Sequence, residues 1–232
     1  MWNFSDPKHI KELYILPYKM KGKAVSHYEI DPVKNDWNTA IKFRNETINQ
    51  RYTAIDFSHN NRWIGAAIKN RNRDTGENEN IVKIWNLESK TLHRILNIEI
   101  PKNIELDTPG GVRYEITSIC FSPDNRFLAV GTDYGLTIYN LSDWTILHHE
   151  PEKYVSDIAF SFDGKVLAMA DRRKLTLWTI ETFTPIAVLS GKGIMSTSLV
   201  VEISPDDKYI AGGGMDGIVR IWDFEKIKEK LY

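Results

Sequence analysis

The hydrophobic positions of the chain fall into short runs that are separated by polar turns. The stretch from Ile119 to Leu141, ICFSPDNRFLAVGTDYGLTIYNL, shows this most clearly: three apolar runs are separated by Ser-Pro-Asp-Asn and by Asp-Tyr-Gly. Each run is short and rich in β-branched and aromatic residues, which favours a strand over a helix of period 3.6. Pro, Asp, Asn and Gly between the runs are typical of tight turns. The stretch therefore predicts strands joined by hairpins.

The same pattern occurs in four copies. The other three begin at Ala54, Asp157 and Val200. In every copy one anchor residue lies in the first run and one aromatic residue ends the third: the pairs are Phe57 and Trp85, Phe121 and Tyr139, Phe160 and Trp178, Ile203 and Trp222. In the first three copies a fourth run follows and opens with Thr91, Thr145 or Thr184. Each copy predicts a four-stranded antiparallel meander.

A meander whose two faces are both apolar is stable only when other elements pack against both faces and exclude water from them. Stacking such sheets around an axis gives a β-propeller, so the expected fold is all-β with about five blades. We expect propeller blades over 51–232, at 51–97, 115–150, 154–191 and 197–232.

The repeats resemble those of the WD-repeat family. The order of strand, Ser-Pro-Asp turn, strand, Asp-Gly turn and aromatic strand end is similar over about residues 52–232, and Trp222-Asp223 reproduces the dipeptide that names the family. The resemblance implies a propeller that mediates protein interactions. The family's Gly-His is missing, with Gly191-Lys192 the nearest match. The buried hydrogen-bond chain that its histidine forms with Ser or Thr, Asp and Trp is therefore not expected here.

Residues 1–50 allow two interpretations. Tyr28, Ile30 and Asp36-Trp37 can be aligned with Tyr139, Leu141 and Asp143-Trp144, which predicts a degenerate partial blade. Alternatively, Asp6 caps a short helix with Pro7 at its first position.

The number of blades raises the question of ring closure. At about 40 residues per repeat the chain holds about five blades, whereas the family usually closes with seven or eight. The ring closes as a tight five-bladed ring, with a second copy of the chain, or with blades of a different chain. The final segment, FEKIKEKLY, reads as a charged and poor fourth strand.

Composition narrows the classes of partner. Thirty basic and 31 acidic residues give a net charge of -1, which does not favour nucleic acid or a membrane surface. The single cysteine, Cys120, is typical of a reducing compartment, and no run reaches the length of a membrane span or has the character of a secretory signal. We expect a cytoplasmic protein.

Catalytic motifs are missing, so neither an enzyme nor a cofactor is expected. We expect Cys120 to be an inert thiol, and His148 and His149 to point to opposite faces of their strand. The first strands carry Asp56, Asp157 and Glu202. These carboxylates would line the propeller channel, where they could hold a divalent cation or cap backbone amides of a neighbouring blade.

Two long connections, at 70–80 and 98–115, emerge on one rim of the expected propeller and are candidates for binding. Positions on this rim correspond to those with which the family commonly binds partners. The candidate residues are Arg51, Arg71, Arg73, Arg113, Glu115, Tyr154, Arg172, Thr197 and Met215.

The sequence thus predicts a noncatalytic protein-interaction scaffold that docks protein partners through its rim or completes its propeller with a second copy or another chain. Two alternatives remain open. One is a cation-binding or enzymatic propeller that uses the channel carboxylates, and the other is a sensor subunit of a larger assembly.

Overall fold

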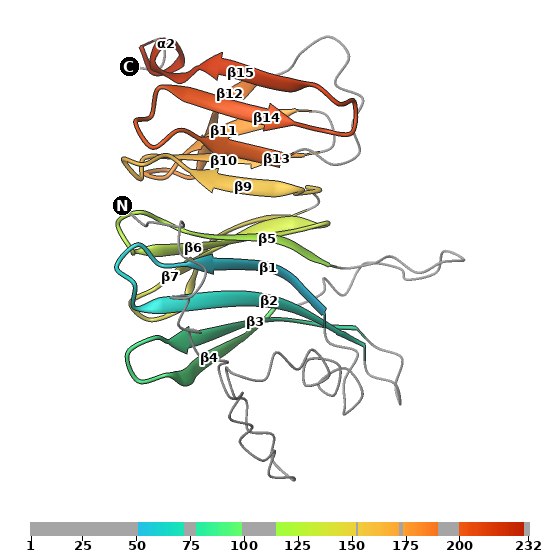
Figure 1. Cartoon of the computed structure of the whole chain (residues 1–232), viewed down its shortest axis with the longest axis vertical. Helices are drawn as coiled ribbons and strands as arrows, with labels where there is room; N and C mark the ends of the chain where they lie inside the picture. The colour runs from blue at the N-terminus through green and yellow to red at the C-terminus, as the bar shows by residue number, and fades with distance from the viewer. Residues whose placement is uncertain are drawn as a thin grey trace, which may run out of the picture.

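The structure of the chain is a computed structural model that describes residues 51–71, 78–98, 115–151, 153–171, 174–189 and 200–229. The described residues form four antiparallel sheets, called blades 1 to 4 in chain order (Figure 1). Blades 1 to 3 have four strands each, and blade 4 has three strands and a short helix. The degenerate blade and the helix predicted within residues 1–50 lie outside the described residues.

The strands follow the sequence repeats. Blade 1 consists of β1 (Arg51–Phe57), β2 (Trp63–Arg71), β3 (Asn78–Asn86) and β4 (Thr91–Asn97). Blade 2 consists of β5 (Ile116–Phe121), β6 (Phe127–Thr132), β7 (Gly135–Asn140) and β8 (Ile146–Pro151). Blade 3 consists of β9 (Asp157–Phe160), β10 (Val166–Ala170), β11 (Leu175–Thr179) and β12 (Thr184–Leu189). Blade 4 consists of β13 (Val200–Ile203), β14 (Tyr209–Gly213), β15 (Val219–Asp223) and α2 (Phe224–Lys228).

The blades stack through their first strands. Strand β1 contacts β5, β5 contacts β9, and β9 contacts β13, so these strands form the inner row of the stack (Figure 1). Within each blade the strands follow in chain order from this row outwards. The predicted all-β, propeller-type fold is confirmed, and the described blades form an open arc and not a closed ring.

A serine closes the first hairpin of every blade. Its hydroxyl donates to an Asn or Asp side chain two residues later and accepts from a backbone amide five residues later, for example Ser122 to Asp124 at 2.6 Å and Phe127 N to Ser122 at 2.9 Å. The third residue after the serine has a positive φ in all four turns: Asn61 (φ 56°), Asn125 (φ 59°), Gly164 (φ 69°) and Asp207 (φ 55°). Side chains of these kinds tolerate this conformation, which explains the polar turn sequences.

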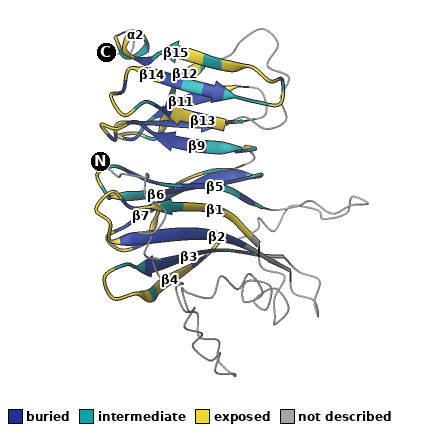
Figure 2. Cartoon of the chain, in the orientation of Figure 1, coloured by how far each residue is buried: buried dark blue, intermediate teal, exposed yellow. Residues whose placement is uncertain are grey.

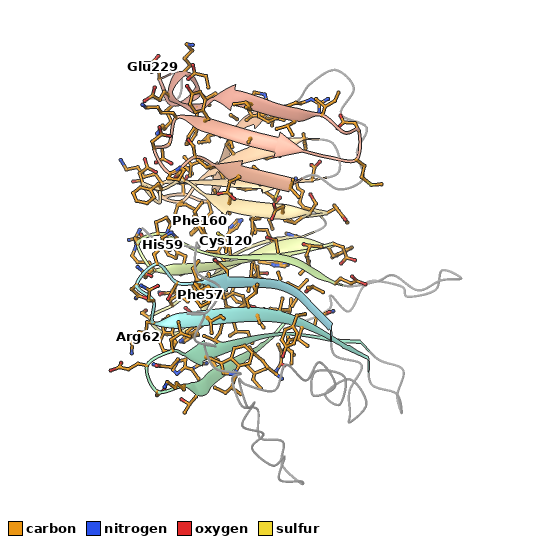
Figure 3. All side chains as sticks on the ribbon, in the orientation of Figure 1. Phe57, His59, Arg62, Cys120, Phe160 and Glu229 are labelled. Atoms are coloured by element: carbon orange, nitrogen blue, oxygen red, sulfur yellow. The ribbon has the colours of Figure 1, made fainter. Side chains whose placement is uncertain are left out.

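The hydrophobic core is divided among the junctions between blades. Phe121 lies in the core between blades 1 and 2, Phe160 in that between blades 2 and 3, and Ile203 in that between blades 3 and 4. Figure 2 shows the buried strands within the stack, and Figure 3 labels Cys120 and Phe160, which pack in the middle junction. Each blade is therefore stabilised by its neighbours.

The C-terminal part of the last repeat differs from the prediction. The segment interpreted as a poor fourth strand begins with helix α2, so that interpretation was wrong. Asp223 caps this helix, its Oδ1 atom accepting from Lys226 N at 3.0 Å. Phe224 is fully buried and anchors the first turn against blade 3. A good N-cap and one apolar anchor thus favour a helix here.

The family's hydrogen-bond chain does not reach two of the third-strand tryptophans. The Nε1 atoms of Trp85 and Trp178 are buried and have no hydrogen-bond partner. This agrees with the absence of the Gly-His motif from the sequence.

Candidate functional site

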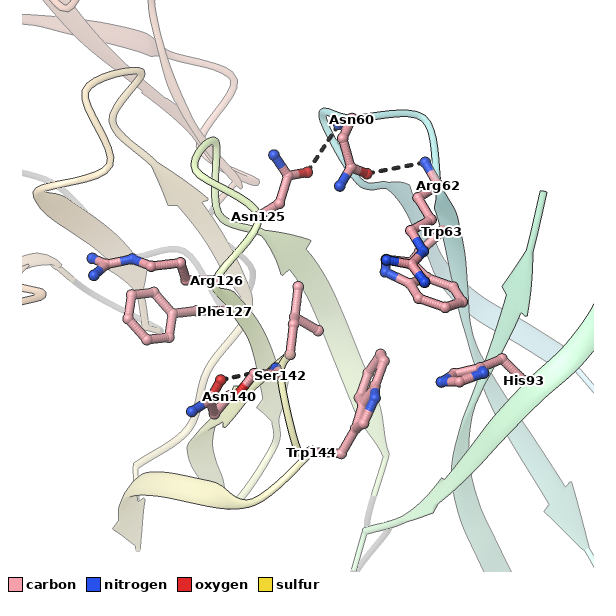
Figure 4. A pocket seen from close by; sticks show the side chains of 11 residues that line it. Asn60, Arg62, Trp63, His93, Asn125, Arg126, Phe127, Asn140, Ser142 and Trp144 are labelled. Atoms are coloured by element: carbon pink, nitrogen blue, oxygen red, sulfur yellow. Dashed lines mark hydrogen bonds between the residues drawn. The ribbon is translucent and has the colours of Figure 1, made fainter. Parts of the chain in front are cut away.

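A pocket of about 610 Å³ lies between blades 1 and 2, at the ends of their hairpins (Figure 4). It is lined by Asn60, Arg62, Trp63, His93, Asn125, Arg126, Phe127, Asn140, Leu141, Ser142 and Trp144. None of these lining residues is a carboxylate. The pocket therefore combines aromatic surface with cationic and amide groups.

The serine turns place the two arginines that line the pocket. Each arginine directly precedes the second strand of its blade: Arg62 precedes Trp63, the first residue of β2, and Arg126 precedes Phe127, the first residue of β6. The Oδ1 atom of Asn60 accepts from Arg62 N at 3.0 Å. Across the junction, Asn60 N donates to Asn125 Oδ1 at 2.9 Å. These bonds hold the two turns, and hence both arginines, at one mouth.

Aromatic rings form the floor of the pocket. The rings of Trp63 and Trp144 meet edge to face at 6.1 Å, and His93 lies over Trp63 at 4.4 Å. Trp144 has a φ of 64°, and its backbone N–H donates to Asn140 O at 2.7 Å. This tight turn aims the indole of blade 2 towards blade 1. Both tryptophans are largely buried, so the floor is rigid.

Cationic groups surround this floor. The guanidinium of Arg62 lies 4.7 Å from the ring centre of Trp63, and that of Arg126 lies 4.8 Å from Phe127. Arg94 lies 5.8 Å from the ring centre of Trp144. Stacking on a ring orients a guanidinium and leaves its edge N–H groups available for hydrogen bonds. At Arg126 the Nε group is bonded to Asp124 Oδ2 at 2.6 Å, which leaves the terminal amino groups.

Two titratable side chains respond to this environment. Burial, followed by the charges of Arg94 and Arg62, lowers the pKa of His93 below its usual value. Burial opposes a low pKa at Asp124, but hydrogen bonds from Ser122 and Arg126 outweigh it and lower the pKa of this carboxyl. Asp124 binds Arg126 at 2.6 Å at the edge of the pocket. The site is thus cationic with a neutral imidazole.

The rim candidates that the structure describes lie at the ends of the strands opposite the pocket. Arg51 begins β1 and Arg71 ends β2, at the same edge of blade 1. Glu115 lies just before β5, and its backbone N–H donates to Asp133 Oδ1 at 3.0 Å within blade 2. Tyr154 is half-buried before β9, and Met215 is exposed in the turn between β14 and β15. Arg73, Arg113, Arg172 and Thr197 lie outside the described residues.

The channel carboxylates connect neighbouring blades. Asp56 Oδ2 accepts from Phe121 N at 2.7 Å, and Asp157 accepts from Ser118 Oγ at 2.8 Å and from Val201 N at 3.0 Å. Burial raises the pKa of Asp56, and burial followed by the charge of Asp157 raises that of Glu202. No group of three His, Cys, Asp or Glu side chains in the described part of the chain is placed to hold a metal ion. Asp56 and Asp157 therefore cap amides of the neighbouring blade, which is one of the two predicted roles.

The remaining candidate groups have structural surroundings. Burial, with a smaller contribution from Asp56, raises the pKa of the half-buried Cys120 to about 12, as expected for an inert thiol. His148 stacks on Phe183 at 5.2 Å, whereas the Nδ1 atom of His149 lies 3.0 Å from Thr137 Oγ1. The two imidazoles therefore have separate partners.

Sequence reasoning missed the pocket, although the repeat alignment held a signal. A basic residue occupies the same position, just before or at the start of the second strand, in all four blades: Arg62, Arg126, Lys165 and Lys208. At the junction of blades 1 and 2, Trp144 lies between two such residues and completes an aromatic pocket.

Comparisons with known proteins agree with the repeat pattern. The family description "WD domain, G-beta repeat" matches residues 108–140 and 183–223. Mouse WD repeat-containing protein 1 is 29% identical over 137 residues, which cover 56% of this chain and 22% of the relative. Actin-interacting protein 1 of Drosophila melanogaster is 30% identical over 154 residues, 62% of this chain and 23% of the relative.

A third relative is mouse WD repeat and HMG-box DNA-binding protein 1, which is 26% identical over 140 residues, 55% of this chain and 12% of its own length. The chain therefore spans a quarter or less of these relatives. Within the described ranges, the structure contains no helix with the length and apolar character that a membrane span requires.

Proposed function

Because the chain is a member of the WD-repeat family, we propose that it is a noncatalytic interaction scaffold that binds an acidic segment of a partner protein in the pocket between blades 1 and 2. Relatives of this kind support an interaction or scaffold role in general. The observation that carries the finer proposal is the arginine-rimmed aromatic pocket, whose lining includes no carboxylate.

The chemistry of the pocket favours a carboxylate-bearing chain. Arg62 and Arg126 present stacked guanidinium groups, which bind carboxylates through two parallel hydrogen bonds. Asn125 and Asn140 add amide groups at the mouth. Glutamates or aspartates of a partner would therefore bind at the rim.

The floor adds an apolar contact. The half-buried Phe127 and the exposed edges of the largely buried Trp63 and Trp144 offer a contact for an aromatic or aliphatic side chain between the acidic residues. Aromatic and arginine side chains are the residue types that contribute most at protein interfaces. Binding would thus join one buried anchor with flanking ion pairs.

The opposite rim is a second docking surface in this proposal. Met215 is 76% exposed there, and methionine adapts to apolar partners of different shapes. We place the scaffold in the cytoplasm, because a single cysteine among 232 residues is typical of a reducing compartment.

A binding titration tests the pocket. The probe is a fluorescein-labelled peptide with one tryptophan between glutamates, and a peptide with lysines in place of the glutamates is the control ligand. Replacing Arg62 and Arg126 together by Gln should weaken binding of the acidic peptide about tenfold, equivalent to about 1.4 kcal/mol. Lys208→Gln changes the same repeat position in blade 4, away from the pocket, and should have no effect.

Salt provides an independent readout. Ion pairs at an exposed rim weaken as ionic strength rises, so the affinity of the acidic peptide should fall with added salt. Equal binding of the acidic and lysine peptides, or equal affinity of the double variant and the wild-type chain, would contradict the proposal.

A further inference from the structure

The two ends of the described stack expose surfaces that are buried at every internal junction. Each blade has a leading face, which contacts the preceding blade, and a trailing face, which contacts the following blade. Blade 1 has no described blade before it and blade 4 has none after it (Figure 1). The ladder registers identify equivalent residues on these faces.

The trailing face of blade 4 keeps the apolar pattern of the other blades. In the third strand it is formed by Val82 and Ile84 in blade 1, Leu136 and Ile138 in blade 2, Leu175 and Leu177 in blade 3, and Val219 and Ile221 in blade 4. The first six side chains are at most 1% exposed. Val219 is 71% exposed and Ile221 is 68% exposed. Their exposure reflects a missing neighbour and not a change in residue type.

The leading face of blade 1 shows the same contrast. Its inner strand carries Ile55 and Phe57, which are 64% and 52% exposed. The equivalent pairs in the following blades are Ile119 and Phe121, Ile158 and Phe160, and Val201 and Ile203, all buried at a junction. On the same face, farther from the axis, Ile64 and Ala66 of β2 and Trp85 of β3 are buried. The exposed part of the leading face of blade 1 is therefore the part formed by β1.

An internal junction shows how these two faces fit. Phe121 of blade 2 packs over Gly65 in the middle of the trailing face of blade 1, where an added Cβ atom would lie 3.2 Å from Phe121 Cε2. Gly65 pairs with Ile84 beside it. The equivalent of Gly65 in blade 4 is Ala211, which pairs with Ile221. The equivalent residue in blade 2 is also an alanine, Ala129, which pairs with Ile138 and packs in one core with Phe160 of blade 3. An alanine at this position of the trailing face therefore accommodates an aromatic ring of the next blade.

We propose that the trailing face of blade 4 binds the leading face of blade 1 from a second copy of this chain. Phe57 of one copy then packs over Ala211 and Ile221 of the other, as Phe160 packs in one core with Ala129 and Ile138 within the chain. A second copy is the occupant that supplies both halves of the junction at once. Two copies related by a twofold axis bury both exposed faces of each chain.

The number of blades supports this arrangement. Two copies contribute eight described blades, which lies within the usual range of four to eight for propellers. The contact is heterologous, so a dimer has two such junctions and the ring is closed when both have formed. Exposed apolar faces of this kind are otherwise prone to aggregation.

Pairs of variants test the proposal with the full 232-residue chain. The wild-type chain should sediment as a dimer at micromolar concentration. Ile221→Glu disables the trailing face and Phe57→Glu the leading face, so each variant alone should sediment with the mass of one chain. In an equimolar mixture, a heterodimer has one junction with two intact faces and one with both substitutions, so more dimer should form than with either variant alone but less than with the wild-type chain. Circular dichroism checks that both variants are folded, as expected for changes at exposed positions.

Cross-linking gives a second measurement that does not depend on destabilising a face. A chain with Phe57→Cys and another with Ala211→Cys should form a disulfide-linked heterodimer on mild oxidation. Ser142→Cys, exposed on the outer part of blade 2, is the control for random collision and should not cross-link with either.

Three results would overturn the proposal. The first is a wild-type chain that stays monomeric at micromolar concentration, which would indicate that another part of the chain or a different protein covers these faces. The second is a single glutamate variant that dimerises as strongly as the wild-type chain, which would indicate that a contact elsewhere holds the dimer. The third is cross-linking of Phe57→Cys and Ala211→Cys no faster than that of the Ser142→Cys control.

Discussion

The backbone N–H of Asn60 donates to the Oδ1 atom of Asn125, 65 residues later, at a distance of 2.9 Å. Asn125 occupies the last position of the blade 2 turn, so this bond joins the first hairpins of adjacent blades. Asp207 does the same for blade 4: its Oδ1 and Oδ2 atoms accept from Phe162 N at 2.7 Å and from Asp163 N at 2.9 Å. We call these contacts inter-blade clamps.

Removing the Asp207 clamp should destabilise the junction between blades 3 and 4. Asp207 has a φ of 55°, so Asp207→Gly removes the acceptor without straining the backbone. Two amides bonded to a carboxylate would lose their partner, and we expect the free energy of unfolding to fall by about 1.5–3 kcal/mol in a urea titration. Asn125→Gly removes one neutral bond between blades and a partly exposed bond from Asn125 Nδ2 to Pro123 O within the turn, and should cost about 1 kcal/mol. Equal losses in the two variants would contradict this assignment.

The junction between blades 2 and 3 offers the converse experiment. The equivalent turn position is Gly164, which has a φ of 69° and no side chain to accept from Asp124 N. Gly164→Asn supplies the acceptor, and asparagine tolerates this conformation, so we expect a gain of about 0.5–1.5 kcal/mol in a urea titration.

Two control substitutions separate the causes at Gly164. Gly164→Ala tests backbone strain alone and should be destabilising. Gly164→Asp places a second carboxylate near Asp124, whose Oδ2 atom lies 3.8 Å from the added Cβ position, and should be less stable than the asparagine variant. If the asparagine variant is no more stable than the alanine variant, a clamp does not form there.

Binding of the acidic peptide should depend on the protonation of His93. Burial and two neighbouring arginines lower the pKa of His93 below its usual 6.5, so the ring is neutral at pH 7. A bound carboxylate favours the protonated ring, so binding takes up a proton and strengthens as the pH falls from 7.5 to 5.5. The peptide glutamates stay largely ionised above about pH 5.

Fluorescence polarisation at several pH values measures this effect. We expect the dissociation constant to fall about two- to fivefold over this range, as for one exposed ion pair. His93→Gln should remove the pH dependence while leaving binding at pH 7.5 nearly unchanged. Parallel pH profiles for the variant and the wild-type chain would exclude His93 as the responsible group.

The Cys120 thiol should resist alkylation in the folded protein. With a pKa of about 12, only about one thiol in ten thousand is ionised at pH 8. Mass spectrometry after iodoacetamide treatment should show no modification of Cys120 in buffer and complete modification in concentrated urea. Phe57→Cys provides an exposed thiol in the same chain, which should be modified readily. Modification of Cys120 at the rate of that thiol would show that the junction opens.

The strands could be predicted because polar turns interrupt the apolar runs at regular positions. Ser122 to Asn125 shows why: local hydrogen bonds within the turn require these residue types, so the turn leaves a signal in the sequence. Helix α2 was missed because FEKIK has an apolar residue at its start and charges after it, a pattern that suits a poor strand as well as a capped helix. The cap at Asp223 decides between them.

The pocket and the clamps could not be predicted, because they arise between blades. Whether Asn60 and Asn125 meet depends on how one sheet is rotated relative to the next. A local sequence pattern carries no information about this rotation. The direction of the Trp144 indole depends on a positive φ at a residue that rarely adopts one. For Asp56, the sequence left metal binding and amide capping open, and the distance to Phe121 N identified the amide.

The serine turns also affect how the chain folds during synthesis. Ser58, Ser122, Ser161 and Ser204 each form their bonds within five residues, so every first hairpin can close as soon as its own segment has left the ribosome. Contacts of such short range form quickly. The apolar faces of an early blade must then wait for the next blade to be translated, and we expect chaperones to act on the nascent chain during this interval.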